Sequence, residues 1–95
     1  GCGAENSKFD FVPDTIWGLN ISEACNVHDL CYHFAEPKIE QKEEADRIFL
    51  NNLYRLIQNH TRLKIMKWLR RRRALKYYLA VKYFGGPAFW DRKND

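Results

Sequence analysis

The chain has 95 residues, so it is expected to form one small domain with a single core. Hydrophobic residues make up 45% of it, enough for a packed core, but no apolar run approaches the roughly 18 residues of a membrane span. The net charge of +4 is unevenly distributed, because residues 1–46 carry ten acidic and three basic side chains and residues 47–95 carry two acidic and thirteen basic ones. This asymmetry predicts an acidic half that bears a site and a basic half attracted to anionic lipid or nucleic acid.

The N-terminal region and the first helix are separated by a change in composition. Residues 1–20 are rich in Gly, Asn, Asp and Pro without a regular period, which predicts a loop. Asn20 or Ser22 can cap a helix that is expected to continue to about Ala35. Pro37 ends it, because proline disfavours helix at the preceding residue.

A second helix is expected from about Lys38 to Asn59, where apolar residues recur at helical spacing. The predicted buried stripe consists of Ile39, Ala45, Phe49, Leu53, Leu56 and Ile57. Asp46 falls on the same side as Phe49 and Leu53, so its carboxylate is expected to point inward.

A third, basic helix is expected from about Arg62 to Phe84, with a candidate break at the four arginines 70–73, and Gly85-Gly86-Pro87 should end it. Its predicted core residues are Leu63, Met66, Leu69, Leu75, Leu79 and Tyr83. The fold class is therefore all-α, a single domain over residues 1–95. Residues 1–20 form a loop, residues 21–60 an antiparallel helix pair, and residues 61–95 the basic helix with an aromatic tail.

The stretch Cys25-Asn-Val-His28-Asp29-Leu-Cys31-Tyr32 concentrates the residues with the most chemistry. On a helix Cys25, His28 and Tyr32 share one face, and Asp29 lies about 100° round from His28. His28 can therefore handle a proton on one side while Asp29 holds a cation on another.

Asp46 is the best candidate partner for His28. Histidine can accept a proton near neutral pH, and a carboxylate on its second ring nitrogen fixes the tautomer that base catalysis needs. The 18 residues from His28 to Asp46 leave room for about two helical turns, a reversal and two turns back. A lone histidine on a helix is more often solvated or simply hydrogen-bonded, so the surrounding residues decide between these interpretations.

Those surroundings resemble secreted phospholipase A2 enzymes, whose active-site helix reads Cys-Cys-x-x-His-Asp-x-Cys-Tyr. Here Ala24 replaces the first cysteine of that pattern. Gly1-Cys2-Gly3-Ala4-Glu5 resembles the start of the family's calcium-binding loop, and Ala45-Asp46-Arg47 resembles a Cys-Asp-Arg on the partner helix. The resemblance covers roughly the first half of the chain, with three separated elements in the family's order.

The resemblance implies calcium-dependent hydrolysis of the sn-2 ester of glycerophospholipids, releasing a fatty acid and a lysophospholipid. His28 would be the general base, Asp46 would orient it, and the Tyr32 hydroxyl would hydrogen-bond Asp46. The family is secreted, so the protein is expected to be extracellular or delivered outside the producing cell.

The resemblance also implies a calcium site. Its ligands would be the Asp29 carboxylate and the backbone carbonyls of Gly1, Gly3 and Glu5, oxygen donors of the kind that calcium prefers. The Gly3 amide would donate to the oxyanion. Glu5 stands where the family has glycine.

The three cysteines allow at most one intrachain disulfide. Cys25 and Cys31 would be roughly 9 Å apart along one helix, too far to bridge, so any intrachain disulfide must use Cys2. The resemblance implies Cys2–Cys25 and leaves Cys31 free, because the family's partner for Cys31 corresponds to Ala45.

The basic helix over residues 62–82 interleaves nine Lys and Arg side chains with Trp68, Tyr77 and Tyr78. We expect it to contact a phospholipid membrane surface, although a solvated helix face explains the same pattern. Ile16, Trp17 and Leu19 are further candidates for lipid contact or for core packing. Nucleic acid is not the expected partner, because no recognition module is present.

Two other functions remain open from the sequence. One is a phospholipase-like module that binds lipid without turnover. The other, less favoured, is a basic nucleic-acid-binding domain stabilised by zinc at Cys2, Cys25, His28 and Cys31. These ligand types suit zinc, but the three that share one helix are spaced so that the helix would have to distort before they could bind one ion.

Overall fold

The computed structural model describes residues 12–87, 89 and 90. A two-stranded hairpin comes first, with β1 over Thr15–Ile16 and β2 over Leu19–Asn20. Three helices follow: α1 over Ser22–Phe34, α2 over Ile39–His60 and α3 over Lys64–Phe84. The chain is therefore a small, mostly helical domain, which confirms the predicted all-α class.

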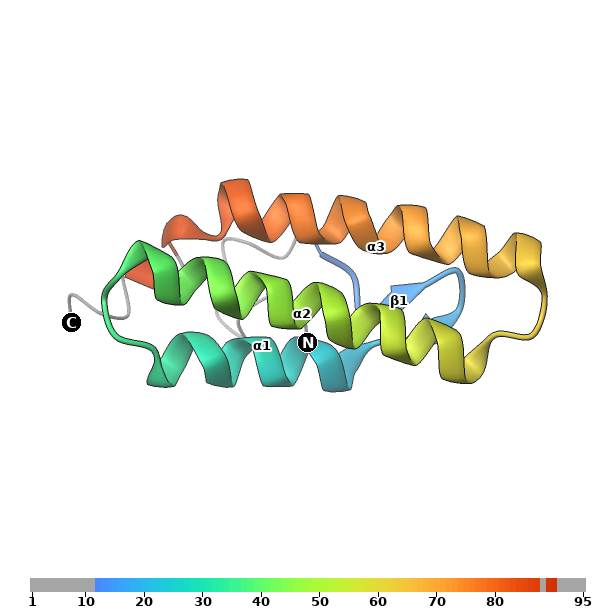
Figure 1. Cartoon of the computed structure of the whole chain (residues 1–95), viewed down its shortest axis with the longest axis horizontal. Coiled ribbons are helices and arrows are strands. Elements are labelled where there is room, and N and C mark those ends of the chain that lie inside the picture. Colours follow the sequence, from blue (N-terminus) through green and yellow to red (C-terminus); the bar gives the residue numbers. More distant parts are fainter. Residues whose placement is uncertain (1–11, 88, 91–95) are drawn as a thin grey trace.

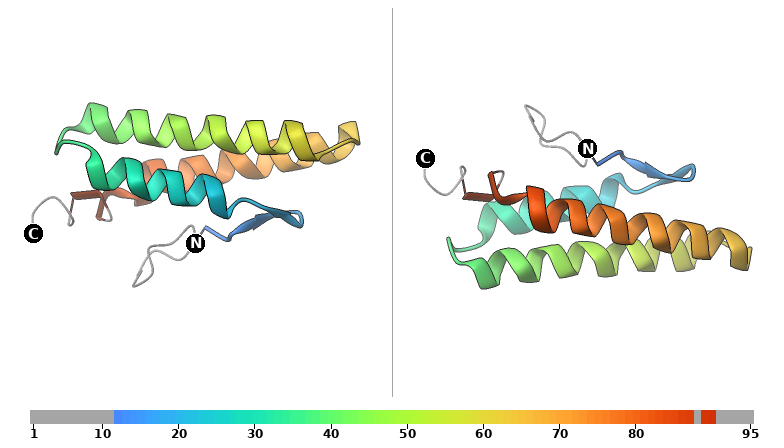
Figure 2. Two further views of the ribbon diagram at one scale, coloured as in Figure 1. Left: turned by 90° about the horizontal axis from the view of Figure 1, so that it is seen from below. Right: turned by 90° about the horizontal axis from the view of Figure 1, so that it is seen from above.

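The long helix α2 is the centre of the fold (Figure 1). Helices α1 and α3 run antiparallel to α2 along its two flanks, and the hairpin lies on the side of α1 and α3 that faces away from α2 (Figure 2). Among the described helices, none combines the length and the apolar character that crossing a membrane requires.

The hairpin corrects the prediction that residues 1–20 are loop throughout. Thr15 pairs with Asn20 and Ile16 with Leu19, and the connecting residues Trp17 and Gly18 both have positive φ, 46° and 79°. Such a two-residue turn twists in the sense that suits the strands, although Trp is an unusual residue for it. The sequence lacks the usual Asn-Gly signal, so its pattern did not reveal the hairpin.

Helix α3 holds the hairpin in place. The Arg70 guanidinium donates to the Trp17 carbonyl over 2.9 Å, and the Tyr77 hydroxyl donates to the Thr15 carbonyl over 2.8 Å. Ile16 is fully buried beneath the hairpin, whereas Trp17 at its tip is exposed. Ile16, one of the three candidates for lipid contact, therefore packs in the core instead.

The three helices begin and end close to the predicted residues. The Asn20 side chain accepts a hydrogen bond of 2.8 Å from the backbone amide of Ser22, the first residue of α1. Helix α3 is continuous through the four arginines 70–73 and ends at Phe84, directly before Gly85. The candidate break in α3 does not occur.

The main core joins the hairpin and all three helices. Its buried members are Val12, Ile16, Ile21, Ala24, Cys25, Phe49, Leu53, Ile57, Ala74, Tyr77 and Val81. A second buried cluster forms where the C-terminal segment returns to α1, with Tyr32, Ala45 and Phe89. Of the predicted α2 stripe, Ala45, Phe49, Leu53 and Ile57 are buried and Leu56 is partly buried. Ile39 is exposed because it lies in the first turn, where the helix end is uncovered.

The predicted core face of α3 is wrong. Leu63, Leu75, Leu79 and Tyr83 are between 38% and 67% exposed, and Met66 and Leu69 are only partly buried. Instead the helix buries Ala74, Tyr77 and Val81, which are spaced i, i+3 and i+7. The small Ala74 and the Tyr77 hydroxyl suit close contact with α2 and the hairpin, and this outweighs the greater hydrophobicity of the leucines.

The cysteines of the structure predict how many free thiols the protein contains. Cys25 is disulfide-bonded and Cys31 is free, whereas the implied partner Cys2 lies outside the described residues. Titration of the denatured, unreduced chain should therefore find one thiol, and full reduction should expose three. Burial, and then the charge of Glu44, raises the pKa of Cys31, so that thiol should react slowly in the native protein. Three thiols before reduction would contradict this assignment.

Candidate active site

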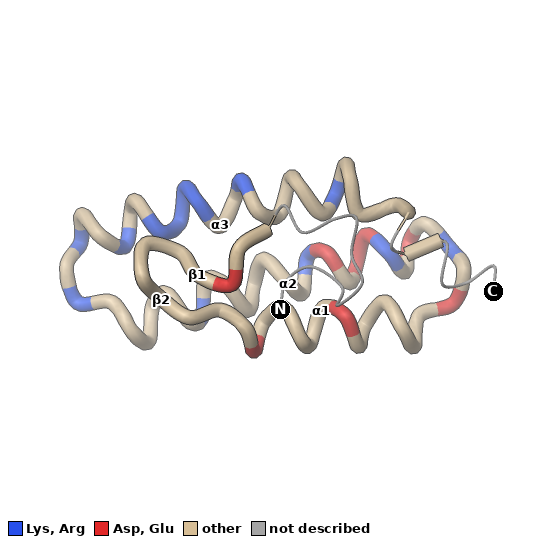
Figure 3. Tube along the Cα trace, turned by 180° about the vertical axis from the view of Figure 1, so that it is seen from behind, with Lys and Arg blue, Asp and Glu red and all other residues tan. Residues whose placement is uncertain are grey.

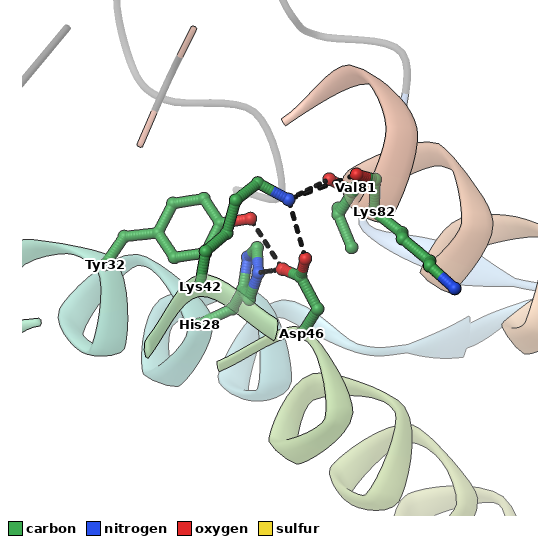
Figure 4. A network of polar contacts seen from close by, with 6 residues as sticks. All are labelled: His28, Tyr32, Lys42, Asp46, Val81 and Lys82. Carbon is green, nitrogen blue, oxygen red and sulfur yellow. Dashed lines mark hydrogen bonds and ion pairs between the residues drawn. The ribbon is translucent and has the colours of Figure 1, made fainter. Parts of the chain in front are cut away.

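Helices α1 and α2 bring His28 and Asp46 into direct contact (Figure 4). His28 Nε2 lies 2.8 Å from Asp46 Oδ1, and the two residues are 5% and 1% exposed. Because a carboxylate accepts, the proton of the neutral imidazole is placed on Nε2 and the lone pair on Nδ1. The His28 ring packs against Phe49, with centroids 4.7 Å apart, so its orientation is fixed on both sides.

Tyr32 supplies a second donor to the same carboxylate oxygen. Its hydroxyl lies 2.5 Å from Asp46 Oδ1, and its ring lies 4.2 Å from that of His28 between centroids. Burial, followed by the negative charge of Asp46, raises the pKa of Tyr32, so the phenol keeps its proton and remains a donor. The ring of Phe89 closes this side of the site edge-on.

Lys42 completes the network, and sequence reasoning missed it. It is 4% exposed, and its ammonium donates to Asp46 Oδ2 over 2.8 Å. The same ammonium donates to the carbonyls of Val81 and Lys82 over 3.1 Å each, in the last turn of α3 (Figure 4). Lys42 therefore connects the C-terminal end of α3 to the candidate catalytic pair, His28 and Asp46. The signal available in the sequence was its position one turn before Asp46 on the same side of α2.

The three donors set the charge of Asp46. Burial alone would raise the pKa of this carboxyl, but the hydrogen bonds from His28, Lys42 and Tyr32 outweigh burial and leave the pKa below its usual value. The carboxylate is therefore ionised at neutral pH, and the Lys42 ammonium balances it. A neutral imidazole can then occupy the site without leaving a net buried charge.

Gly85 keeps the end of α3 close to the site. A methyl group at this position would clash with the Val81 carbonyl oxygen and lie 3.0 Å from the Tyr32 hydroxyl. On Gly86, a methyl group would meet no described residue closer than Trp90, at 3.8 Å.

Gly85→Ala should therefore destabilise the fold by about 1–3 kcal/mol and displace Tyr32, whereas Gly86→Ala should change stability little. Urea unfolding of the two variants provides the comparison. Equal stabilities would show that the end of α3 adjusts freely.

Asp29 lies beside His28 on α1 and points to a different part of the surface. It is half-buried and, with Asn26, Leu30 and His33, lines an open hollow. The other calcium ligands implied by the resemblance, the carbonyls of Gly1, Gly3 and Glu5, lie outside the described residues, as does the Gly3 amide. Within residues 12–87, 89 and 90 no group of three or more His, Cys, Asp or Glu side chains could hold a metal ion. Of the implied ligands, the described residues contain the Asp29 carboxylate, a hard-oxygen donor of the kind that calcium accepts.

The alternative zinc site is inconsistent with the cysteine chemistry. Cys25 is disulfide-bonded, so it cannot supply the thiolate that zinc requires, and His28 Nε2 is already engaged by Asp46. Asp29 and Asp46 would also have no role in such a site.

Comparisons with known proteins do not assign the chain to a family. No protein-family model matches the chain, and the comparisons with curated proteins and with solved structures find no similar protein. The geometry of this site and the resemblance of its motifs are therefore the evidence for its function.

Proposed function

We propose that this chain is a calcium-dependent phospholipase A2 that hydrolyses the sn-2 ester of glycerophospholipids to a fatty acid and a lysophospholipid. The observation that carries the proposal is the buried contact of 2.8 Å between His28 Nε2 and Asp46 Oδ1. An imidazole held in this way has one defined tautomer, with Nδ1 as the basic nitrogen.

His28 acts as a general base in this reaction. Its Nδ1 takes a proton from water while the water oxygen bonds to the ester carbonyl carbon, and the resulting imidazolium is stabilised by the Asp46 carboxylate. When the ester C–O bond breaks, His28 returns the proton to the departing glycerol oxygen. Tyr32 and Lys42 keep Asp46 in place and ionised throughout.

Asp29 has a separate role in the proposal. It would hold calcium together with the carbonyls of Gly1, Gly3 and Glu5, and the Gly3 amide would donate to the oxyanion. When bound, calcium supplies positive charge for the substrate phosphate and the developing oxyanion. The disulfide at Cys25 is typical of oxidising compartments and supports action outside the producing cell.

Fatty-acid release from mixed phospholipid vesicles tests the proposal. The full chain should release only the sn-2 acyl chain of lipids with two distinguishable acyl groups, and excess EGTA should abolish this release. Asp29→Asn keeps the size of the side chain but removes its charge, so it should raise the calcium concentration required. Leu30→Ala is the neighbouring control, since Leu30 is exposed in the same hollow. A folded chain that releases no fatty acid at any calcium concentration would overturn the enzyme and favour a lipid-binding module without turnover.

A further inference from the structure

Helix α3 exposes a row of apolar side chains on the face opposite its core face. Its exposed members are Ile65, Trp68, Leu75, Leu79 and Tyr83. At about 100° per residue these five positions fall within an arc of about 80°, and the stripe extends about 27 Å along the helix. Ala74, Tyr77 and Val81 lie on the opposite side. Exposed apolar residues in a long row differ from the scattered ones that are normal on a protein surface.

Basic side chains border this stripe. Arg72 lies within the stripe and Lys76 beside it. Along the other edge lie Lys64, Arg71 and Lys82. The Arg72 guanidinium lies 4.8 Å from the Trp68 ring centroid, and the Lys82 ammonium lies 5.5 Å from that of Tyr83. Cations therefore stand beside the aromatic rings at the surface.

Acidic side chains are absent from the same region. The sequence has no Asp or Glu between Arg47 and Trp90, and Figure 3 shows Lys and Arg along α3 while Asp and Glu occur on α1, in the first half of α2 and just before β1. Of the ion pairs among the described residues, none involves a side chain of α3. The positive charge of this face is therefore available to an external anion.

We infer that the outer face of α3 is a docking surface for an anionic phospholipid bilayer, with the apolar stripe inserted at the level of the headgroups and the basic side chains against the phosphates. An amphipathic helix with Lys and Arg beside Trp and Leu has the composition of segments that lie in the membrane interface. Trp68 and Tyr83 have the apolar rings and polar atoms that the interface favours. Docking does not depend on the proposed hydrolysis.

Other occupants suit the face less well. A second copy of the chain would bring two rows of like charge together, which opposes association. A nucleic acid would use the cations but leave the apolar stripe in water. A bilayer satisfies both features at once.

Vesicle co-sedimentation tests the surface, with the full chain carrying His28→Gln and with EGTA present, so that neither turnover nor calcium affects the result. We expect binding to vesicles of phosphatidylcholine with phosphatidylglycerol, weaker binding to phosphatidylcholine alone, and a loss of affinity as salt increases. Because catalysis is disabled, failure of this binding and failure of hydrolysis are distinguishable.

Two matched variants locate the contact. Leu75→Ser with Leu79→Ser should lower the affinity for anionic vesicles about tenfold in a chain that remains folded, since the two side chains are 43% and 38% exposed. Leu30→Ser with Phe34→Ser removes two exposed apolar side chains from α1 instead and should leave the affinity unchanged. Lys64→Gln with Lys76→Gln should weaken binding and flatten its salt dependence.

Four outcomes would overturn the inference. The first is the absence of binding to anionic vesicles, and the second is loss of binding in the α1 variant but not in the α3 variant. The third is that the chain self-associates instead of binding vesicles and that the Leu75 and Leu79 substitutions abolish this self-association. The fourth is binding to duplex DNA without binding to vesicles.

Discussion

His28→Gln is expected to lower calcium-dependent release of fatty acid by about a thousandfold while the chain remains folded. The glutamine amide can still donate to Asp46 Oδ1, so the buried carboxylate keeps a partner where His28 Nε2 now lies at 2.8 Å. It cannot accept a proton from water, because an amide nitrogen has no basic lone pair. Initial rates on mixed vesicles at saturating calcium measure the loss, and thermal unfolding shows whether the fold persists.

His60→Gln is the matched control for this substitution. His60 is an exposed histidine in the last turn of α2, remote from Asp46 along the helix, so its replacement should change neither rate nor stability. Equal loss of activity in both variants would mean that His28 is not the base. Full activity of His28→Gln would place the reaction elsewhere on the chain.

Asp46→Asn is expected to destabilise the fold by about 3 kcal/mol. Asparagine can still accept from His28 and Tyr32, but its amide nitrogen would face the Lys42 ammonium, which is now 2.8 Å from a carboxylate oxygen. A buried cation would then lack its counter-ion and meet another donor. Urea unfolding at neutral pH measures the change.

Lys42→Met, alone and combined with Asp46→Asn, shows whether this cause is correct. Methionine fills a similar volume without charge, so the double variant removes both the stranded cation and the clash between donors. The double variant should therefore be about 1–2 kcal/mol more stable than the sum of the single effects predicts. Additive effects would show that Lys42 and Asp46 contribute independently, and that the carbonyls of Val81 and Lys82 alone hold the ammonium.

The local pattern of the sequence predicted the helices well. Helical periodicity, Pro37 and Gly85 are properties of short segments, and the observed α1, α2 and α3 begin and end within about two residues of the expected positions. The spacing of His28 and Asp46 on two antiparallel helices also anticipated that their side chains could meet. These predictions required only the geometry of a helix and a short reversal.

Which face of α3 is buried could not be predicted from local sequence patterns. That helix carries two stripes, one with Ala74, Tyr77 and Val81 and one with Leu75, Leu79 and Tyr83, and hydrophobicity favours the wrong one. The choice depends on contacts with residues far away in sequence, such as the hydrogen bond of Tyr77 to the Thr15 carbonyl, 62 residues apart.

The position of Lys42 was undetermined for the same reason. Its side chain is buried only because the last turn of α3 presents the carbonyls of Val81 and Lys82 across from α2, about 40 residues away. The hairpin likewise depends on Arg70 and Tyr77 of α3. Local sequence patterns therefore specified the helices and the residues able to form the site. The packing of α3 against α2 and the hairpin determined the rest, because burial and hydrogen bonding between distant segments exist only in the assembled fold.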